Sequence, residues 1–250
     1  MAKVLIPLPD RDFDVTEVSV PWKVLTRAGH SVTFATEQGT VAAADPLLLS
    51  GVIFGQLGAE PEPKKFYREL ESSEEFAHPI KWSDIEPSKF DGLILPGGHA
   101  KGMRQYLASE TLFAKVAEFW ASNHPVGAIC HGVLVLARAR NPATQKSLLA
   151  TRTTTCLPKY MERTAYFLTA WKLGGYYRTY DAYVEEEVRA NLNEPDAQFK
   201  LGPRTLTERG TDSSDKGAFV VTDGNYVSAR WPGDAYLFAK TFMDLLARGA

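Results

Sequence analysis

The stretch PVGAICHG at residues 125–132 decides the fold. Its first five residues are apolar or small and predict a buried strand, and an apolar helix is predicted to follow with no loop between them. Cys130 stands at the joint, and the small residues at 127, 128 and 132 allow a tight turn. This layout is typical of a nucleophile elbow, in which a strained turn lifts a reactive side chain above the edge of a parallel sheet.

The elbow predicts a reactive thiol. Cys130 lies where the helix begins, and the partial positive charge of a helix N-terminus favours the thiolate. The backbone N–H of His131 is expected to point toward the same spot and to act as an oxyanion donor. The alternative interpretation is an ordinary buried cysteine followed by a surface histidine.

Outward from the elbow, the chain alternates between strands and helices. Buried strands are predicted at 3–8, 31–36, 90–95 and 125–129, helices at 17–28, 109–123, 130–139 and 234–246, and a hairpin at 219–229. This alternation predicts an α/β fold with a mostly parallel sheet covered by helices on both faces.

Two stretches interrupt the alternation. Residues 40–89 contain spaced prolines, among them Pro61, Pro63, Pro79 and Pro87, and clustered glutamates, and we expect an insertion with helical pieces such as 64–70. Residues 151–185 are rich in tyrosine, threonine and tryptophan and show no clean period.

Composition narrows the class of protein. The chain has 250 residues, of which 44% are hydrophobic and 23% charged, which excludes a disordered chain, a collagen and a simple coiled coil. We expect one domain over residues 1–250. The net charge of −2 provides no overall positive potential that would attract nucleic acid or an anionic membrane. Two cysteines are too few to form a disulfide framework. Because the early apolar run, Val4 to Leu8, is too short for a signal peptide, we expect a cytoplasmic protein.

Two further motifs are expected at the same edge of the sheet. Gly97, Gly98 and His99 follow the strand predicted at 90–95, and paired glycines let backbone N–H groups approach a ligand. Glu17 opens the first helix, and beside a thiolate it would be desolvated, protonated and able to donate a hydrogen bond to the sulfur. An ordinary turn and a favourable helix-start charge are the alternatives.

Three motifs together resemble the ThiJ/PfpI family of class I glutamine amidotransferase-like proteins. They are EVSVP at 17–21, LPGGH at 95–99 and AICHG at 128–132, in the order and spacing of the family. The resemblance implies a flavodoxin-like three-layer α/β sandwich, a reactive cysteine and a homodimer.

The Cys-His pair and the insertion are most similar to the glyoxalase III and heat-shock chaperone branch. That branch pairs its histidine with an acid about thirty residues after the cysteine, and Glu162 lies 162 − 130 = 32 positions beyond Cys130. The resemblance therefore implies a Cys130-His131-Glu162 triad. A solvated helix carboxylate beside Arg163 is the alternative for Glu162.

Two segments depart from that branch. The aromatic residues between 160 and 180 are more numerous than in the branch, and could form a lid above Cys130, part of the core, or a dimer surface. The loop at 230–234, RWPGD, replaces an Asn-Pro segment that reaches the pocket in relatives.

The leading functional hypothesis is a cysteine-dependent enzyme acting on a small reactive carbonyl, of the glutathione-independent glyoxalase or deglycase type, with no cofactor. Catalytic roles are predicted for Cys130, His131, Glu162 and Glu17, and substrate or oxyanion binding for the glycine-rich turn. The alternatives are an amidase or peptidase, and a chaperone or oxidative-stress sensor without enzymatic activity. No metal is expected, and a weaker idea brings His78 and His99 together around an ion.

Overall fold

The computed structural model describes residues 1–52 and 57–248. A seven-stranded sheet in the order β5-β3-β1-β6-β7-β9-β8 forms its centre. All neighbouring strands pair in parallel except β8 and β9, which form an antiparallel hairpin at the edge. The strands of this sheet are β1 (Lys3–Pro7), β3 (Ser31–Thr36), β5 (Ile80–Lys81), β6 (Gly92–Leu95), β7 (Val126–Ile129), β8 (Val220–Asp223) and β9 (Tyr226–Ala229).

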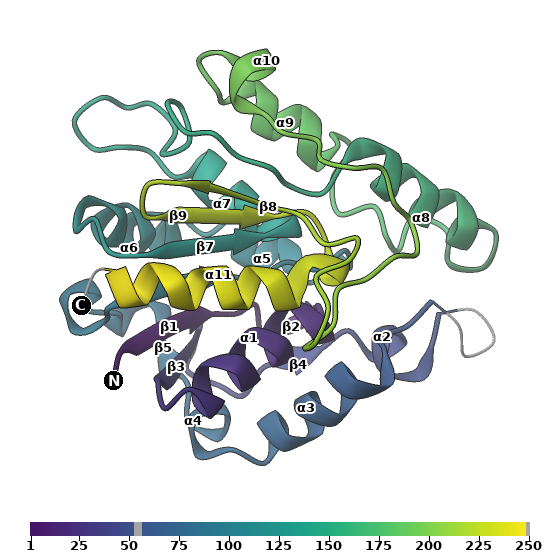
Figure 1. Ribbon diagram of the computed structural model, residues 1–250, viewed down its shortest axis with the longest axis horizontal. Helices are drawn as coiled ribbons and strands as arrows, with labels where there is room; N and C mark the ends of the chain where they lie inside the picture. The colour runs from purple at the N-terminus through teal and green to yellow at the C-terminus, as the bar shows by residue number, and fades with distance from the viewer. Residues whose placement is uncertain (53–56, 249–250) are drawn as a thin grey trace.

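Helices cover both faces of this sheet (Figure 1). On one face, α11 packs on β7 and β9 and contacts α1, which in turn packs on α3; on the other, α6 packs against α7. The helices are α1 (Val15–Arg27), α2 (Pro46–Ser50), α3 (Pro61–Glu71), α4 (Glu74–Ala77), α5 (Met103–Leu107), α6 (Glu110–Ala121), α7 (Val133–Arg138), α8 (Lys159–Leu173), α9 (Val184–Ala190), α10 (Pro195–Gln198) and α11 (Ala235–Arg248). None of the helices in these described ranges has both the length and the apolar character of a membrane span.

The predicted α/β sandwich is confirmed, and the first helix begins two residues earlier than predicted, at Val15. Asp14 caps α1 by accepting hydrogen bonds from the backbone N–H groups of Thr16 and Glu17, and Ser109 caps α6. Gly29, with a φ of 80°, follows the end of α1. The hairpin at 219–229 forms as β8 and β9, with Gly224 in its turn at a φ of 61°.

The interruptions contain more structure than the sequence suggested. The insertion at 40–89 holds α2, α3 and α4, contributes β5 to the main sheet, and pairs β4 (Ala43–Ala44) with β2 (Arg11–Phe13) in a small separate sheet. Residues 53–56 of this insertion lie outside the described residues. The aromatic stretch contains α8, which the sequence did not predict. Only Met161, Glu162 and Thr169 of this helix are buried, so its sequence carries little of the periodic signal that identifies a helix.

A buried ion pair fixes the loop after β9. Arg230 and Asp234 are both fully buried, and their charged atoms approach to 2.8 Å. Arg230 also donates hydrogen bonds to the carbonyl oxygens of Pro203 and Gly217. The guanidinium thus ties three stretches of chain together and holds the Trp231-Pro232 loop beside the strand ends.

Replacing Arg230 should cost much more stability than breaking an exposed pair. Arg230→Met leaves the Asp234 carboxylate buried without its partner, and we expect the free energy of unfolding to fall by about 3–5 kcal/mol. Lys89→Met, which breaks the exposed pair with Glu86, should cost less than about 1 kcal/mol. Urea denaturation of both variants measures the difference, and equal losses would contradict this interpretation.

Candidate active site

The elbow has the strained geometry that its sequence predicts. β7 runs directly into a single 3₁₀ turn, Cys130–Gly132, and then into α7. Cys130 adopts a φ of 57°, in the left-handed region that non-glycine residues rarely occupy. Gly132 makes the turn possible, because a Cβ at that position would lie 2.0 Å from the carbonyl oxygen of Leu95. Neighbouring strand β6 therefore dictates a glycine two residues after the cysteine.

The cysteine and histidine side chains face one another. Cys130 Sγ lies 3.5 Å from His131 Nδ1, and both side chains are only 1% exposed. On the other side of the ring, His131 Nε2 lies 3.2 Å from Thr179 Oγ1. The Thr179 hydroxyl uses its only proton to donate to the carbonyl oxygen of His99 at 2.6 Å.

This arrangement fixes the tautomer of His131. Since the Thr179 proton goes to a carbonyl, which can only accept, the hydroxyl oxygen must accept a hydrogen bond from His131 Nε2–H. Nδ1 is then left without a proton and faces the thiol. The sequence did not single out Thr179, because no motif surrounds it and 48 residues separate it from the histidine.

Glu17 lies beside the thiol, as the sequence predicts. Its Oε2 accepts a hydrogen bond from the backbone N–H of Gly97 at 2.8 Å. Oε1 is buried, and the described residues give it no hydrogen-bond partner. The Cys130 thiol interacts with this carboxyl. Burial raises the pKa of Glu17 well above its usual value, and the nearby Asp14 raises it further. The carboxyl is therefore protonated at neutral pH, and its proton belongs on Oε1.

The low pKa expected for Cys130 is not found. Burial raises the pKa of the thiol well above its usual value, although the backbone N–H of His131 opposes this rise. Burial also lowers the pKa of His131 well below its usual value and that of His99 to about 4. At neutral pH the site is a thiol, two neutral imidazoles and a protonated carboxyl, because desolvation outweighs the partial charge of a short helix.

The glycine-rich turn packs against the elbow, but its first amide is already used. Gly97 donates its N–H to Glu17, and a Cβ at this position would lie 2.7 Å from the backbone nitrogen of His131. Gly98 fits under the chain before α1, where a Cβ would lie 2.6 Å from the carbonyl oxygen of Asp12. The roles of Gly97, Gly98 and His99 toward an oxyanion or substrate stay predictions.

Glu162 is not the partner of His131. Its carboxylate is buried in α8, accepts a hydrogen bond from the backbone N–H of Val184 at 3.1 Å, and lies 3.6 Å from Arg178 Nη1. The Cys130-His131-Glu162 triad is therefore not confirmed. Glu162 has the spacing that the family branch suggests, but its carboxylate contacts the start of α9, and Thr179 contacts the imidazole.

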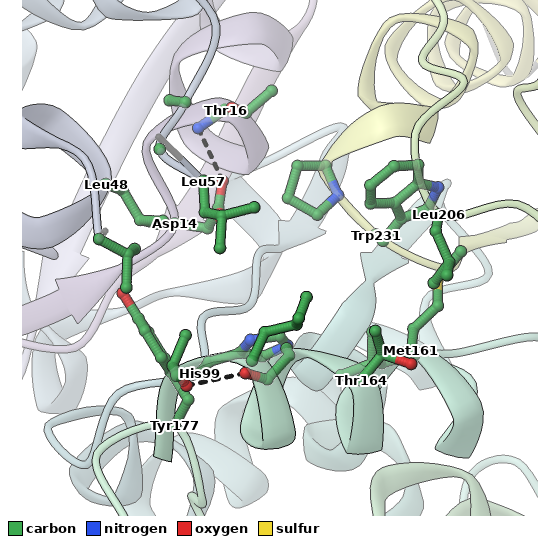
Figure 2. Close-up of a pocket in the computed structure, with 18 of the residues that line it drawn as sticks. Asp14, Thr16, Leu48, Leu57, His99, Met161, Thr164, Tyr177, Leu206 and Trp231 are labelled. Carbon is green, nitrogen blue, oxygen red and sulfur yellow. Dashed lines mark hydrogen bonds between the residues drawn. The ribbon is translucent and has the colours of Figure 1, made fainter. Parts of the chain in front are cut away.

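A cavity of about 360 Å³ lies beyond the carboxyl ends of the strands (Figure 2). Its walls come from the start of α1, the chain around α2, helix α8, and the loops at 206–209 and 231–232. His99 lines the cavity and stands next to the thiol, since its ring centroid is 5.0 Å from that of His131. Cys130 itself does not line the cavity. The His99 ring therefore lies between the cavity and the Cys130 sulfur.

The aromatic segment contributes to this wall in part. Tyr177 lines the cavity and donates a hydrogen bond to Asp45, and α8 presents Met161, Ala165 and Leu168 to the same space. Other aromatic side chains of the segment point elsewhere: Phe167 is 64% exposed and Trp171 is 68% exposed.

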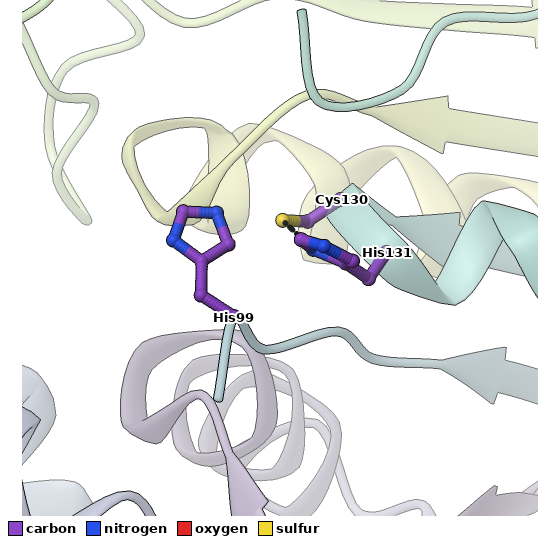
Figure 3. Close-up of side chains that lie close together, drawn as sticks. All are labelled: His99, Cys130 and His131. Atoms are coloured by element: carbon purple, nitrogen blue, oxygen red, sulfur yellow. Dashed lines mark hydrogen bonds between the residues drawn. The ribbon is translucent and has the colours of Figure 1, made fainter. Parts of the chain in front are cut away.

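Three donor atoms of the site could hold a metal ion. One ring nitrogen of His99, the Cys130 sulfur and one ring nitrogen of His131 lie within 4.8 Å of one another (Figure 3). One thiolate and two imidazoles form a donor set that suits zinc. The weaker idea of a site shared by His78 and His99 finds no support, because His78 is exposed and pairs with Glu74.

Comparison with known proteins places this geometry in a family. The family described as ThiJ/PfpI family-like matches residues 8–203. The chain belongs to the ThiJ/PfpI family. An uncharacterised protein of Schizosaccharomyces pombe is 31% identical over 98% of this chain and 84% of its own length. A deglycase of Pyrococcus abyssi is 24% identical over 98% of this chain and 99% of its own length. The crystal structure of glyoxalase III from Candida albicans superposes with a TM-score of 0.71 at 20% identity, covering 98% and 97% of the two chains.

Glu17→Gln should change how stability depends on pH. In the folded protein Glu17 keeps its proton, whereas in the unfolded chain it loses this proton above about pH 4.5. As pH rises from 4.5 toward the pKa in the folded state, this difference lowers the free energy of unfolding. Glutamine can still accept from Gly97 and has no proton to lose. We expect its stability relative to wild type to increase between pH 4 and pH 8 in urea denaturation. Glu118→Gln, at an exposed position, is the control; parallel curves for Glu17→Gln and wild type would contradict the assignment.

Thr179→Val should slow alkylation of Cys130, because His131 loses the group that holds its tautomer. We expect a decrease of roughly two- to tenfold, the equivalent of one hydrogen bond, whereas Thr179→Ser should keep the wild-type rate. The rate with iodoacetamide is followed by mass spectrometry in a Cys156→Ser background between pH 6 and 9. It should rise throughout this range, and a plateau at low pH would show a preformed thiolate instead.

Proposed function

We propose that this protein is a cysteine-dependent enzyme that converts a 2-oxoaldehyde to a 2-hydroxy acid without glutathione, a reaction of the glyoxalase or deglycase type. The observation that carries the proposal is the Cys130 thiol facing the unprotonated Nδ1 of His131 at 3.5 Å, with Glu17 at the sulfur. The full-length similarity to a Pyrococcus abyssi protein named a deglycase supports it.

In the first step, Cys130 attacks the aldehyde carbon. Because the thiol is protonated, His131 Nδ1 accepts its proton as the sulfur–carbon bond forms, and this proton passes to the aldehyde oxygen to give a hemithioacetal. The protonated Glu17 carboxyl holds the sulfur by a hydrogen bond and adds no negative charge beside it.

In the second step, His131 moves a proton between adjacent carbons. It takes the hydrogen from the former aldehyde carbon and returns it to the neighbouring carbon, while the hydroxyl proton of the first carbon passes to the oxygen of the second. The first carbon is thereby oxidised to a thioester and the second is reduced to an alcohol. Water then cleaves the thioester, releases the 2-hydroxy acid and restores the thiol. The sum is the 2-oxoaldehyde plus one water, so no external oxidant or reductant is required.

Thr179 replaces a carboxylate as the group that orients the imidazole. A hydroxyl that accepts from Nε2–H fixes the tautomer but stabilises an imidazolium much less than a carboxylate does. This suits a shuttle in which His131 carries the proton only briefly. It also agrees with the low pKa that burial imposes on this ring.

The direct test is the formation of lactate from methylglyoxal in the absence of glutathione. We expect wild type and Cys156→Ser to be active, Cys130→Ala to be inactive, and His131→Gln to lose about 100- to 10,000-fold in kcat/KM. A chelator is included to test whether an ion in the His99-Cys130-His131 cluster takes part. Equal rates for wild type and Cys130→Ala would overturn the proposal, and cleavage of chromogenic amides alone would favour a cysteine hydrolase.

A further inference from the structure

The cavity beside His99 is much larger than a three-carbon substrate needs. A cavity of about 150 Å³ is enough to bind benzene, and methylglyoxal has fewer heavy atoms than benzene. The cavity here has a volume of about 360 Å³, which is in the range of pockets that bind drug-sized ligands. Methylglyoxal would leave most of this space without contacts.

Most of the side chains that line the cavity are apolar, and the polar ones are spread among them. Figure 2 shows Met161, Leu206 and Trp231 on one side, with Thr164 beside Met161, and His99 and Tyr177 away from them. Tyr177 lies against His99 at 5.9 Å between ring centroids, and the His99 ring is the wall nearest the thiol. A ligand whose carbonyl end lies toward His99 can place an apolar tail against Met161 and Trp231.

Apolar side chains make up part of the exposed lining of the cavity, together with the exposed Thr207. Leu57, Leu168 and Leu206 line the cavity and are each about half exposed, at 51%, 50% and 52%. An apolar chain that enters between them removes both its own surface and theirs from water.

Of the residues that line the cavity, His99 is the one whose ring nitrogen lies within 4.8 Å of the Cys130 sulfur. Its Nε2 is buried, and the described residues give it no hydrogen-bond partner. Rotation of this ring therefore breaks no hydrogen bond from Nε2. We infer that this rotation admits the carbonyl end of a ligand to Cys130, while its tail stays between α8 and the Trp231 loop.

From these observations we propose that the substrate is a 2-oxoaldehyde with an apolar chain of about six carbons or more, bound with its tail in this cavity. This inference rests on the function proposed above and names the substrate class. The reaction upstream of such a substrate is one that produces reactive carbonyls from long apolar chains.

The test compares methylglyoxal, 2-oxohexanal and 2-oxooctanal as substrates of the wild-type protein. We expect kcat/KM to rise by about fourfold for each added methylene until the cavity is filled, mainly through KM. If methylglyoxal is converted but kcat/KM does not change along the series, the inference fails while the proposed function stands.

Two matched variants on α8 locate the tail. Ala165→Phe fills the cavity, whereas Ala170→Phe adds the same group to the same helix at a residue that does not line it. We expect the ratio of kcat/KM for 2-oxooctanal to that for methylglyoxal to fall at least tenfold in Ala165→Phe and to stay at the wild-type value in Ala170→Phe. Ala165→Leu is a milder substitute if the phenylalanine variant does not fold. A ratio unaffected by either substitution at 165 would overturn the placement.

If no substrate is turned over, a binding measurement tests the apolar ligand class separately from the proposed enzymatic function. 2-Octanone and acetone are unreactive probes for calorimetry, and we expect 2-octanone to bind wild type at least tenfold more tightly, with this preference lost in Ala165→Phe. Binding without turnover would refute the proposed function and keep the apolar ligand class. Equal or undetectable binding of both ketones would refute the ligand class.

Discussion

The site depends on one buried hydrogen bond, from the backbone N–H of Gly97 to Glu17 Oε2. It joins the first helix to the turn after β6, and it leaves the second carboxyl oxygen buried without a hydrogen-bond partner among the described residues. Gly97 has to be a glycine, because a Cβ would lie 2.9 Å from that same oxygen and 3.0 Å from the Cβ of Cys130. Three segments far apart in the sequence meet here without room for one more methyl group.

Burial then determines which chemistry the site can perform. Desolvation penalises every charged form, so the thiol and the carboxyl keep their protons while the two imidazoles stay neutral. A preformed thiolate is not needed if a neighbouring base removes the proton during attack, and His131 has the tautomer for this role. A neutral site also accepts a neutral carbonyl substrate without paired charges, in keeping with the apolar cavity that adjoins it.

The parts of the site that the sequence predicted are those encoded by short-range patterns. The strand ending at Ile129, the strained Cys130 and the glycine two residues later are constraints within eight residues, and a carboxylate at the first helical turn adds one more. Thr179 and Glu162 show where this reasoning ends. Both are buried polar residues, and nothing in their local sequence indicates which one reaches the imidazole. The family spacing favoured Glu162, but the backbone N–H of Val184 and the guanidinium of Arg178 already take up its carboxylate.

The sequence by itself determined the alternating architecture, the elbow and the meeting of Cys130 with Glu17 at one sheet edge, because hydrophobic periodicity and turn chemistry are local properties. Only the tertiary structure decided the protonation states, the partner of His131 and the shape of the cavity. These depend on the exclusion of water and on contacts between segments such as α8 and the Trp231 loop, whose side chains are brought together by packing and carry no periodic signal of their own.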